Sequence, residues 1–322
     1  MKLWLHKLLH WEYWPVNLVY FPSFIAWCWY ALKFRSLSFY AYANPSIKNG
    51  GLYGDSKYEI YKLLPKGLYP YTLLINKDAT VNFDLLLNEH SLSFPVIVKP
   101  DIGCRGVGVK KVFNNAELCA YQHEIKANFL IQEISEYPNE LGLFYWRLPN
   151  QKQGKISGIT LKKFLTVEGN GVHTLEELLR KNPRYELQLT KLKEHYDLKE
   201  IVPAGKQKCL VPFGNHNRGT EFTDGKIYIT NKLEQTFDAL LREIPGFYYG
   251  RLDIRYTSLA ELEEGRNFSI IELNGAKSEP THIYDPAHSF VYGQREIFKH
   301  QNIFQHIVKL NLSLSKTNQF NN

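Results

Sequence analysis

Charged or amide side chains occupy alternate positions in two segments of the C-terminal third of the chain. The segment FYYGRLDIRY (247–256) contains Asp253 between two arginines, and FSIIELN (268–274) ends with Glu272 and Asn274. Side chains two residues apart in a β-strand point to the same face, so Glu272 and Asn274 face one way. If the two strands pair as a hairpin, Asp253 joins them and three oxygen donors converge.

Converging oxygen donors of this kind suit a hard divalent cation. Mg²⁺ is commonly bound by one or two carboxylates together with substrate phosphates, without histidine or cysteine. The sequence therefore predicts a site for one or two Mg²⁺ ions, or for Mn²⁺ in their place, at Asp253, Glu272 and Asn274. The alternative is a salt bridge, because Arg251 or Arg255 on the first strand could neutralise the buried acids.

A glycine-rich loop lies in FPVIVKPDIGCRGVGVKKV (94–112). A strand is expected at 96–98, and a second one where hydrophobic alternation resumes at Val107 and Val109. Glycines let backbone N–H groups converge on phosphate oxygens, and Lys99 at the strand end adds a positive charge. No G-K-[ST] sequence and no helix follows, so this is neither a Walker A loop nor a dinucleotide fingerprint. A purely structural glycine-rich hairpin is the alternative. The loop contains Gly103, Arg105, Gly106 and Gly108.

A linker that follows the apolar run Phe129–Ile131 could contact the base and sugar of a nucleotide. Gln132, Glu133 and Ile134 end this run, and a linker at a strand end can present backbone groups to an adenine edge. Glu140 follows shortly afterwards and is expected to bind ribose hydroxyls. The alternative is that Glu133 and Glu140 are exposed acids, as most glutamates are.

Two adjacent lysines, Lys162 and Lys163, belong to another expected strand. They must point to opposite faces, so one faces inward, where it could contact phosphate, and the other faces solvent. The same region contains Thr174 three residues before Glu177, a capping-box pattern that predicts a helix over 175–180.

Composition excludes several classes of protein. The chain has 322 residues, 44% of them hydrophobic, which is enough for a sizeable core. The net charge of +7 suits nucleotides or anionic lipid surfaces, whereas nucleic acid is not expected because no dense Lys/Arg tract occurs. No C-x-x-C pair occurs, so zinc knuckles and disulfide frameworks are not expected and a reducing, cytoplasmic location fits. The four cysteines are Cys28, Cys104, Cys119 and Cys209.

The uncharged segment 13–32, YWPVNLVYFPSFIAWCWYAL, has three interpretations. It is long enough to span a bilayer, but Pro15 and Pro22 interrupt it. Its many Trp and Tyr residues are typical of a segment at headgroup depth, and packing onto the protein's own core is the third interpretation. We favour peripheral contact with the inner face of the membrane.

Taken together, these motifs resemble the ATP-grasp superfamily, in particular its D-alanine–D-alanine ligase and its cyanophycin or glutamate ligase branches. The resemblance covers residues 80–290, and the R-x-D strand and the E-x-N strand in that order are its most specific elements. The segment GNGVHTLEELL also resembles the G-x-G-x-H-T-x-x-E-L segment of cyanophycin-synthetase-like ligases. The matching residues are Lys99 with its glycine loop, Gln132, Glu133, Glu140, Arg251, Asp253, Glu272 and Asn274.

The resemblance implies an α+β protein in which two subdomains clasp ATP. It places an aromatic, substrate-entry region at 1–79, the first subdomain with the glycine loop at 80–135, and the second subdomain with the metal site at 136–322. Lys99 and either Lys162 or Lys163 would hold phosphates, with Lys162 also catalytic, and the glycine loop would cover them. Arg251 would stabilise the charge of an acyl phosphate and of its tetrahedral adduct.

The family reaction joins a carboxylate to an amine through an acyl phosphate, so both substrates are expected to be small molecules. After the E-x-N element the chain reads GAKSEPTHIYDP, which differs from D-alanine ligases, and its N-terminal region is aromatic instead of glycine-rich. The loop PFGNHNRGTEFTDG (212–225) is a candidate grip for an acidic substrate or a solvated polar loop. An ATP-grasp kinase and a non-catalytic, membrane-associated nucleotide-binding protein are the alternative functions, and the oligomeric state is not predicted.

Overall fold

The smaller of two main sheets forms the first α+β unit. The computed structural model describes residues 3–104, 106–212, 214 and 216–320. A four-stranded antiparallel sheet has the order β1-β4-β2-β3. Side chains from β2, β4 and two short helices fill its core, including Val98, Ile131 and Leu118. The elements are β1 (Thr72–Ile75), α4 (Phe83–Glu89), β2 (Val96–Pro100), β3 (Lys110–Val112), α5 (Asn115–Glu124) and β4 (Phe129–Gln132).

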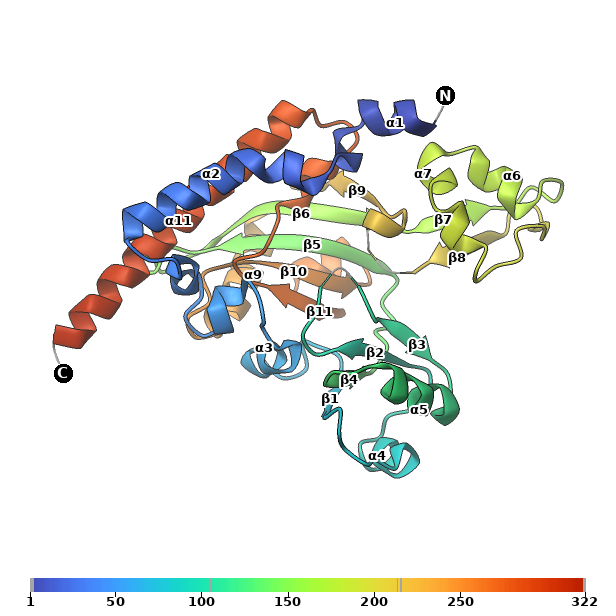
Figure 1. Cartoon of the computed structure of the whole chain (residues 1–322), viewed down its shortest axis with the longest axis horizontal. Helices are drawn as coiled ribbons and strands as arrows, with labels where there is room; N and C mark the ends of the chain where they lie inside the picture. Colours follow the sequence, from blue (N-terminus) through green and yellow to red (C-terminus); the bar gives the residue numbers. More distant parts are fainter. Residues whose placement is uncertain (1–2, 105, 213, 215, 321–322) are drawn as a thin grey trace.

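The larger sheet crosses the middle of the molecule (Figure 1). Its five strands are antiparallel neighbours in the order β11-β10-β5-β6-β9. The strands are β5 (Asn139–Trp146), β6 (Lys155–Lys163), β9 (Glu221–Asp224), β10 (Tyr249–Tyr256) and β11 (Phe268–Asn274). The helices next to it are α9 (Asn231–Arg242), α10 (Leu259–Glu263) and α11 (Phe290–Phe320). Both strands predicted around the acidic residues are therefore present.

Strand alternation divides β10 between two environments. Leu252 and Ile254 point into the main core with Phe237 of α9. Tyr249 points to the opposite face and packs on Phe304 of α11, with 5.2 Å between ring centroids. The next residues on the Tyr249 face are Arg251, Asp253 and Arg255, which are charged. Helix α11 therefore covers one end of this face and leaves the charged end open.

A small α/β unit projects beyond the C-terminal end of β6 (Figure 1). It contains the two-stranded sheet of β7 and β8, and its own core includes Leu175 and Leu179. The capping box at Thr174 and Glu177 is confirmed, with both reciprocal hydrogen bonds present. The elements are β7 (Leu165–Glu168), α6 (Leu175–Arg180), α7 (Pro183–Glu186), α8 (Leu189–Leu192) and β8 (Gln207–Val211).

The aromatic N-terminal segment packs along α11. Helix α2 (Val16–Phe34) contains Pro22, and Trp27 stacks on Phe304 at 5.4 Å. Packing onto the protein's own core is thus correct for one side of this helix. Within the residues that the structure describes, no helix combines the length and apolar character needed to cross a membrane. The other N-terminal elements are α1 (Leu3–Leu9), α3 (Lys57–Leu63) and short 3₁₀ turns at Trp11–Tyr13, Phe39–Ala43 and Lys48–Gly51.

Two predicted boundaries differ from those observed. Strand β1 pairs with β4, so the first unit begins at residue 72, ahead of the predicted boundary at 80. The second strand of the glycine hairpin begins at Lys110, after the predicted alternation at Val107 and Val109. Val107 is 73% exposed and lies in a turn, because positive φ angles at the flanking glycines bend the chain there.

The buried amide of Asn44 links the N-terminal region to the large sheet. Asn44 is fully buried; its Nδ2 donates to the carbonyls of Gly50 and Tyr249, and its Oδ1 accepts from the N–H groups of Tyr248 and Tyr249. Asn44→Ala removes these four hydrogen bonds from a fully buried site, where the Gly50 carbonyl keeps a second partner in the Ala276 N–H, so we expect the change to lower the free energy of unfolding by about 3 kcal/mol or more. Urea denaturation measures this, with the exposed Asn88→Ala as control, and equal stability of the two variants would contradict it.

His300 on α11 should make stability depend on pH. Burial lowers its pKa to about 4, and its ring contacts Ser157 at 2.9 Å. An unfolded histidine titrates near 6.5, so below that pH the unfolded state binds a proton that the folded state does not. Stability should therefore fall between pH 6.5 and about 4, by on the order of 3 kcal/mol. His300→Gln should flatten this slope in pH-resolved denaturation curves, whereas the exposed His306→Gln should keep it.

Candidate active site

A cavity of about 1080 Å³ lies between the two main sheets. Strands β2 and β4 contribute one wall, and β5, β6, β10 and β11 contribute the other. The glycine loop, the turn His216–Arg218 and the N-terminal segment complete the lining. Nearly every residue singled out from the sequence therefore faces one cavity.

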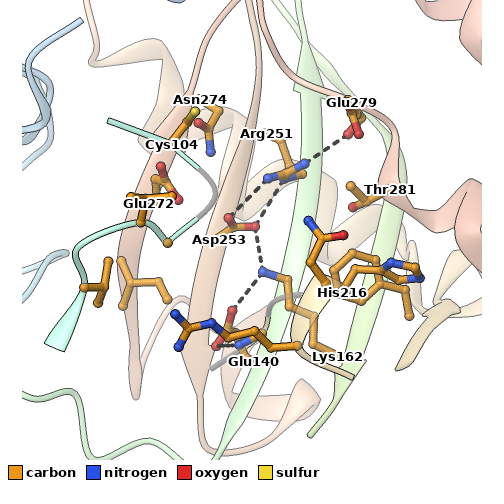
Figure 2. A pocket seen from close by; sticks show the side chains of 18 of the residues that line it. Cys104, Glu140, Lys162, His216, Arg251, Asp253, Glu272, Asn274, Glu279 and Thr281 are labelled. Atoms are coloured by element: carbon orange, nitrogen blue, oxygen red, sulfur yellow. Dashed lines mark hydrogen bonds and ion pairs between the residues drawn. The ribbon is translucent and has the colours of Figure 1, made fainter. Parts of the chain in front are cut away.

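The R-x-D and E-x-N strands pair as the hairpin hypothesis requires. In the antiparallel register of β10 and β11, Asp253 is opposite Glu272 and Arg251 is opposite Asn274. Figure 2 shows these side chains on the same face of the sheet, around the cavity that they all line. A β-bulge after Asp253 shifts the register beyond this point, so the alignment is specific to the site end of the hairpin.

Asp253 is ionised and paired with two cations. Its carboxylate lies 3.0 Å from Lys162 Nζ and 3.2 Å from Arg251 Nε. Burial opposes its ionisation, but the positive charges of Arg251 and Lys162 outweigh this effect and lower the pKa of Asp253. The salt bridge considered as an alternative to a metal site is thus present at Asp253, and it involves Arg251 together with Lys162.

Glu272 and Asn274 are different, because their side chains are not held by close contacts. Within the described part of the chain, the half-buried Glu272 carboxylate makes no hydrogen bond or close ion pair, although Lys57 and Arg251 lie near enough to attract it, and the buried Asn274 Nδ2 has no hydrogen-bond partner. Buried polar groups are usually paired, so the unpaired amide beside this carboxylate leaves room for an additional ligand. The amide oxygen and nitrogen are interchangeable by a flip, which makes Asn274 an available oxygen donor.

The donor set therefore fits Mg²⁺ or Mn²⁺. Among the described residues, no group of three or more His, Cys, Asp and Glu is placed to hold a metal by itself. Two carboxylates and one amide, completed by substrate phosphates, are nonetheless an ordinary set for Mg²⁺. Asp253, Glu272 and Asn274 would hold such an ion.

The two adjacent lysines are separated by strand alternation. Lys162 is buried, lines the cavity and donates to Glu140 Oε1 at 2.8 Å. Burial favours its neutral form, but Asp253 and Glu140 outweigh this and raise the pKa of Lys162. Lys163 is exposed on the opposite face and lines a second, smaller pocket, so of the two lysines only Lys162 faces the main cavity and the placement of Lys163 does not support phosphate binding there.

Glu140 is not an exposed acid. It is buried in β5, and its second carboxylate oxygen lies 3.2 Å from Arg255 Nε and accepts from the N–H of Gly214 at 3.3 Å. Both oxygens are engaged, so in this arrangement Glu140 positions Lys162 and Arg255. Ribose binding by Glu140 stays a prediction and requires one of these contacts to open.

Lys99 is held at the opposite wall by a relay of hydrogen bonds. Its Nζ donates to the Tyr61 hydroxyl and to Gln132 Oε1, both at 2.8 Å, and Gln132 Nε2 donates to Thr72 Oγ1 at 2.7 Å. The Gln132 side chain therefore supports Lys99. The chain that follows it, Glu133–Ile134, lines the cavity as a base-binding linker would, with the Glu133 side chain exposed.

The glycine loop reaches the cavity near Glu272 and Asn274, where Cys104 lies beside both side chains (Figure 2). Gly106 and Gly108 have φ angles of 69° and 74°, a conformation that side chains disfavour. A Cβ on Gly108 would also lie 2.9 Å from the Pro100 ring. Gly103 lines the cavity, and its carbonyl accepts from Lys57 Nζ at 2.7 Å. Arg105 lies outside the described residues.

Several cavity residues carried no signal in the sequence. Lys57 on α3 lies beside Glu272 and Lys99, and burial lowers the pKa of its amine. Glu12 forms a buried ion pair with Arg184 at 2.7 Å and contacts His216 at 2.7 Å. These groups come from distant parts of the chain, and only the fold brings them together. His216, predicted as a substrate contact, is thus engaged with Glu12.

Removal of the Lys162 amine should destabilise the folded protein. Lys162→Met leaves Glu140 and Asp253 with one cation fewer inside the protein, so we expect it to lower the free energy of unfolding by about 3–5 kcal/mol. Lys163→Met, on the exposed face of the same strand, should change it by less than about 0.5 kcal/mol. Chemical denaturation of both variants measures the difference, and similar values for the two would contradict the burial of this charge network.

Comparisons with known proteins give structural matches alone. No protein-family model and no curated protein matches the chain. It is similar to the D-alanine–D-alanine ligase of Bacillus anthracis complexed with ATP (15% identity, TM-score 0.44, 82% of this chain and 67% of that one). It is also similar to VanG D-Ala:D-Ser ligase of Enterococcus faecalis (14%, 0.42, 80% and 61%). A bifunctional glutathione synthetase of Pasteurella multocida matches at 15% identity and TM-score 0.39 over 76% of this chain, which spans 36% of that protein.

The motifs lie on two facing units of the structure. Lys99 and the glycine loop lie on one α+β unit, the R-x-D and E-x-N strands lie on the other, and one cavity separates them. The α+β class predicted from the sequence is confirmed, and two units on either side of a cavity are the arrangement that the resemblance to ATP-grasp proteins implies.

Proposed function

We propose that the chain is an ATP- and Mg²⁺-dependent ligase that joins a carboxylate to an amine. The observation that carries the proposal is the convergence, on one cavity, of Lys99 and the glycine loop from one sheet with Asp253, Glu272 and Asn274 from the other. Phosphate-binding and metal-binding groups on facing walls suit a nucleotide triphosphate whose terminal phosphate is transferred.

The size and charge of the cavity support this assignment. Its volume of about 1080 Å³ exceeds the usual range for a single small ligand, roughly 300–1,000 Å³, so a nucleotide and a second substrate fit together. Lys99 and Lys162 would contact the phosphates, backbone N–H groups of the glycine loop would cover them, and the linker Gln132–Ile134 would contact adenine. A bound Mg²⁺ would neutralise phosphate charge and so favour attack by an anionic substrate.

In the proposed reaction a substrate carboxylate oxygen attacks the γ-phosphorus, the bond to the β-phosphate oxygen breaks, and ADP leaves. The amine nitrogen then attacks the acyl carbon, and phosphate departs as the amide forms and the nitrogen loses a proton. Arg251 keeps its guanidinium beside Asp253 and donates to the Glu279 carbonyl at 3.3 Å, so it is held at the metal-binding end of the cavity. A fixed cation there would stabilise the negative charge of the adduct.

The two substrates would bind at the end of the cavity farthest from the adenine linker. This end is lined by the N-terminal segment and by the exposed cation Arg218. Arg218 would contact a substrate carboxylate. ADP release measured with and without added amines separates the ligase from a kinase: a ligase needs the amine for turnover, whereas a kinase releases ADP with its acceptor alone.

Glu272→Gln tests the metal assignment with little risk to folding. Because Glu272 makes no hydrogen bond or close ion pair and is attracted by Lys57 and Arg251 only at longer range, we expect the free energy of unfolding to change by less than about 1 kcal/mol. ADP release should fall by about 100-fold or more, since a ligand of the ion is lost, and Mg²⁺ should no longer strengthen nucleotide binding. Calorimetry with ATP, with and without Mg²⁺, measures the second effect.

The exposed Glu89→Gln on α4 is the matched control and should behave as the unmodified chain does. Normal turnover and normal Mg²⁺ dependence in Glu272→Gln would refute the metal site. Loss of stability in that variant would instead reveal a structural role for Glu272.

A further inference from the structure

An apolar ridge runs along the outside of the N-terminal helices. Helix α2 packs on the protein with one side only, and its other side exposes large hydrophobic residues to between 56% and 72%. Its neighbour α1 exposes Trp4, Leu8 and Leu9 in the same way. The exposed ridge on α2 consists of Leu18, Phe21, Phe24, Ile25, Trp29 and Leu32.

The ridge adjoins helix α11. Lys33 at its end donates to Gln305 of α11 at 2.7 Å, and the Val19 carbonyl accepts from Gln294 at 2.9 Å. Trp29 lies four residues before Lys33, one turn back on the same side of the helix. Figure 1 shows the two helices side by side at the outer edge of the molecule.

Helix α11 adds a basic stripe beside the ridge. Lys309 follows Gln305 by four residues, so it lies on the side of α11 that contacts α2, and Phe298 follows Gln294 by the same interval. The exposed residues of the stripe recur every three or four positions. They are Arg295, Lys299, Asn302, His306, Lys309, Ser313 and Lys316.

Most of the net charge of the chain is concentrated in these helices. Residues 1–38 and 289–322 contain eight Lys and Arg and two acids, which accounts for six of the seven net positive charges. Neither acid is free: Glu12 is buried against Arg184, and Glu296 lies 3.1 Å from Lys299. The remainder of the protein is nearly neutral.

We propose that the ridge and the stripe bind the surface of an anionic lipid bilayer. Aromatic and aliphatic side chains on one side of a helix, next to lysines and arginines, insert at headgroup depth and attract anionic lipids. Helix α2 is about 28 Å long at 1.5 Å per residue and lies along the protein, so it docks parallel to the bilayer. A second copy fits less well, because pairing through this face brings two basic stripes together.

Docking in this orientation places one wall of the cavity next to the lipid. Tyr13, Trp14, Val16 and Val19 line the cavity from the same N-terminal segment whose other side forms the ridge. A substrate carried by the bilayer would thus reach the cavity along this segment. The proposal does not depend on the ligase activity, because it concerns a surface and requires no nucleotide.

Co-sedimentation of the full chain with vesicles tests the proposal. One vesicle type contains phosphatidylglycerol and phosphatidylcholine in equal amounts, and the other contains phosphatidylcholine alone. We expect the chain to sediment with the anionic vesicles and to partition about tenfold less onto the neutral ones. The double variant Phe21→Glu/Trp29→Glu should lose at least about tenfold in partitioning. Because both side chains are exposed, its thermal melting should be unchanged.

Two further double variants test the contribution of the lysines and the specificity of the apolar ridge. Lys309→Gln/Lys316→Gln should lose the preference for anionic lipid. Val172→Glu/Ile227→Glu changes two apolar residues on other surfaces that are even more exposed than Phe21 and Trp29, and it should bind as the unmodified chain does.

Either of two results would overturn the proposal. The first is an unmodified chain that sediments with neither vesicle type. The second is a concentration-dependent dimer, seen by light scattering without lipid, that Phe21→Glu/Trp29→Glu dissociates and that binds no vesicles. The second result would assign the ridge to a second copy of the chain. Amine-dependent ADP release without vesicles is measured separately, so failure of docking and failure of the ligase proposal are distinguishable.

Discussion

The buried pairing of Lys162 with Asp253 and Glu140 is the constraint on which the site depends. The adjacent strands β10, β5 and β6 contribute Asp253, Glu140 and Lys162. Arg251 also pairs with Asp253, and Arg255 pairs with Glu140. Isolated buried charges cost several kcal/mol each, so any slip in register that separated them would be strongly unfavourable. The same register places Glu272 opposite Asp253. Among the residues that the structure describes, a carboxylate that makes no hydrogen bond or close ion pair is thus held beside a network whose members are all paired.

The contrast between paired and unpaired groups also explains how one sheet face can be stable and available to ligands. The face of β10 that begins at Tyr249 is covered by α11 and its aromatic rings. Beyond that point charge pairing replaces apolar packing, and the cavity begins. Fixed dipoles and charges of this kind need little reorganisation when a ligand binds.

Local patterns determined what the sequence could predict. The period of two in 247–256 and 268–274 predicted both strands and the common face of Asp253, Glu272 and Asn274, and the Thr174 to Glu177 spacing predicted a helix start. Where the pattern was ambiguous, the prediction failed. Val107 and Val109 alternate like a strand, but glycines on either side turn the chain instead. Lys162 and Lys163 could be told apart only by register, and the contact of Glu12 with Arg184 joins residues 172 positions apart.

If the ridge binds lipid as proposed, the two sides of helix α2 make that contact inseparable from folding. Trp27 covers Phe39 and Phe304 with one side of the helix, while Phe21 and Trp29 are exposed on the other. Deletion of the first 35 residues would expose Phe39 and Phe304 to solvent, and it would also remove the outer apolar surface of the helix. If such a shortened chain no longer sediments with membranes, the cause could be a damaged core as readily as the loss of the lipid-binding surface. Substitutions of single exposed residues distinguish the two causes.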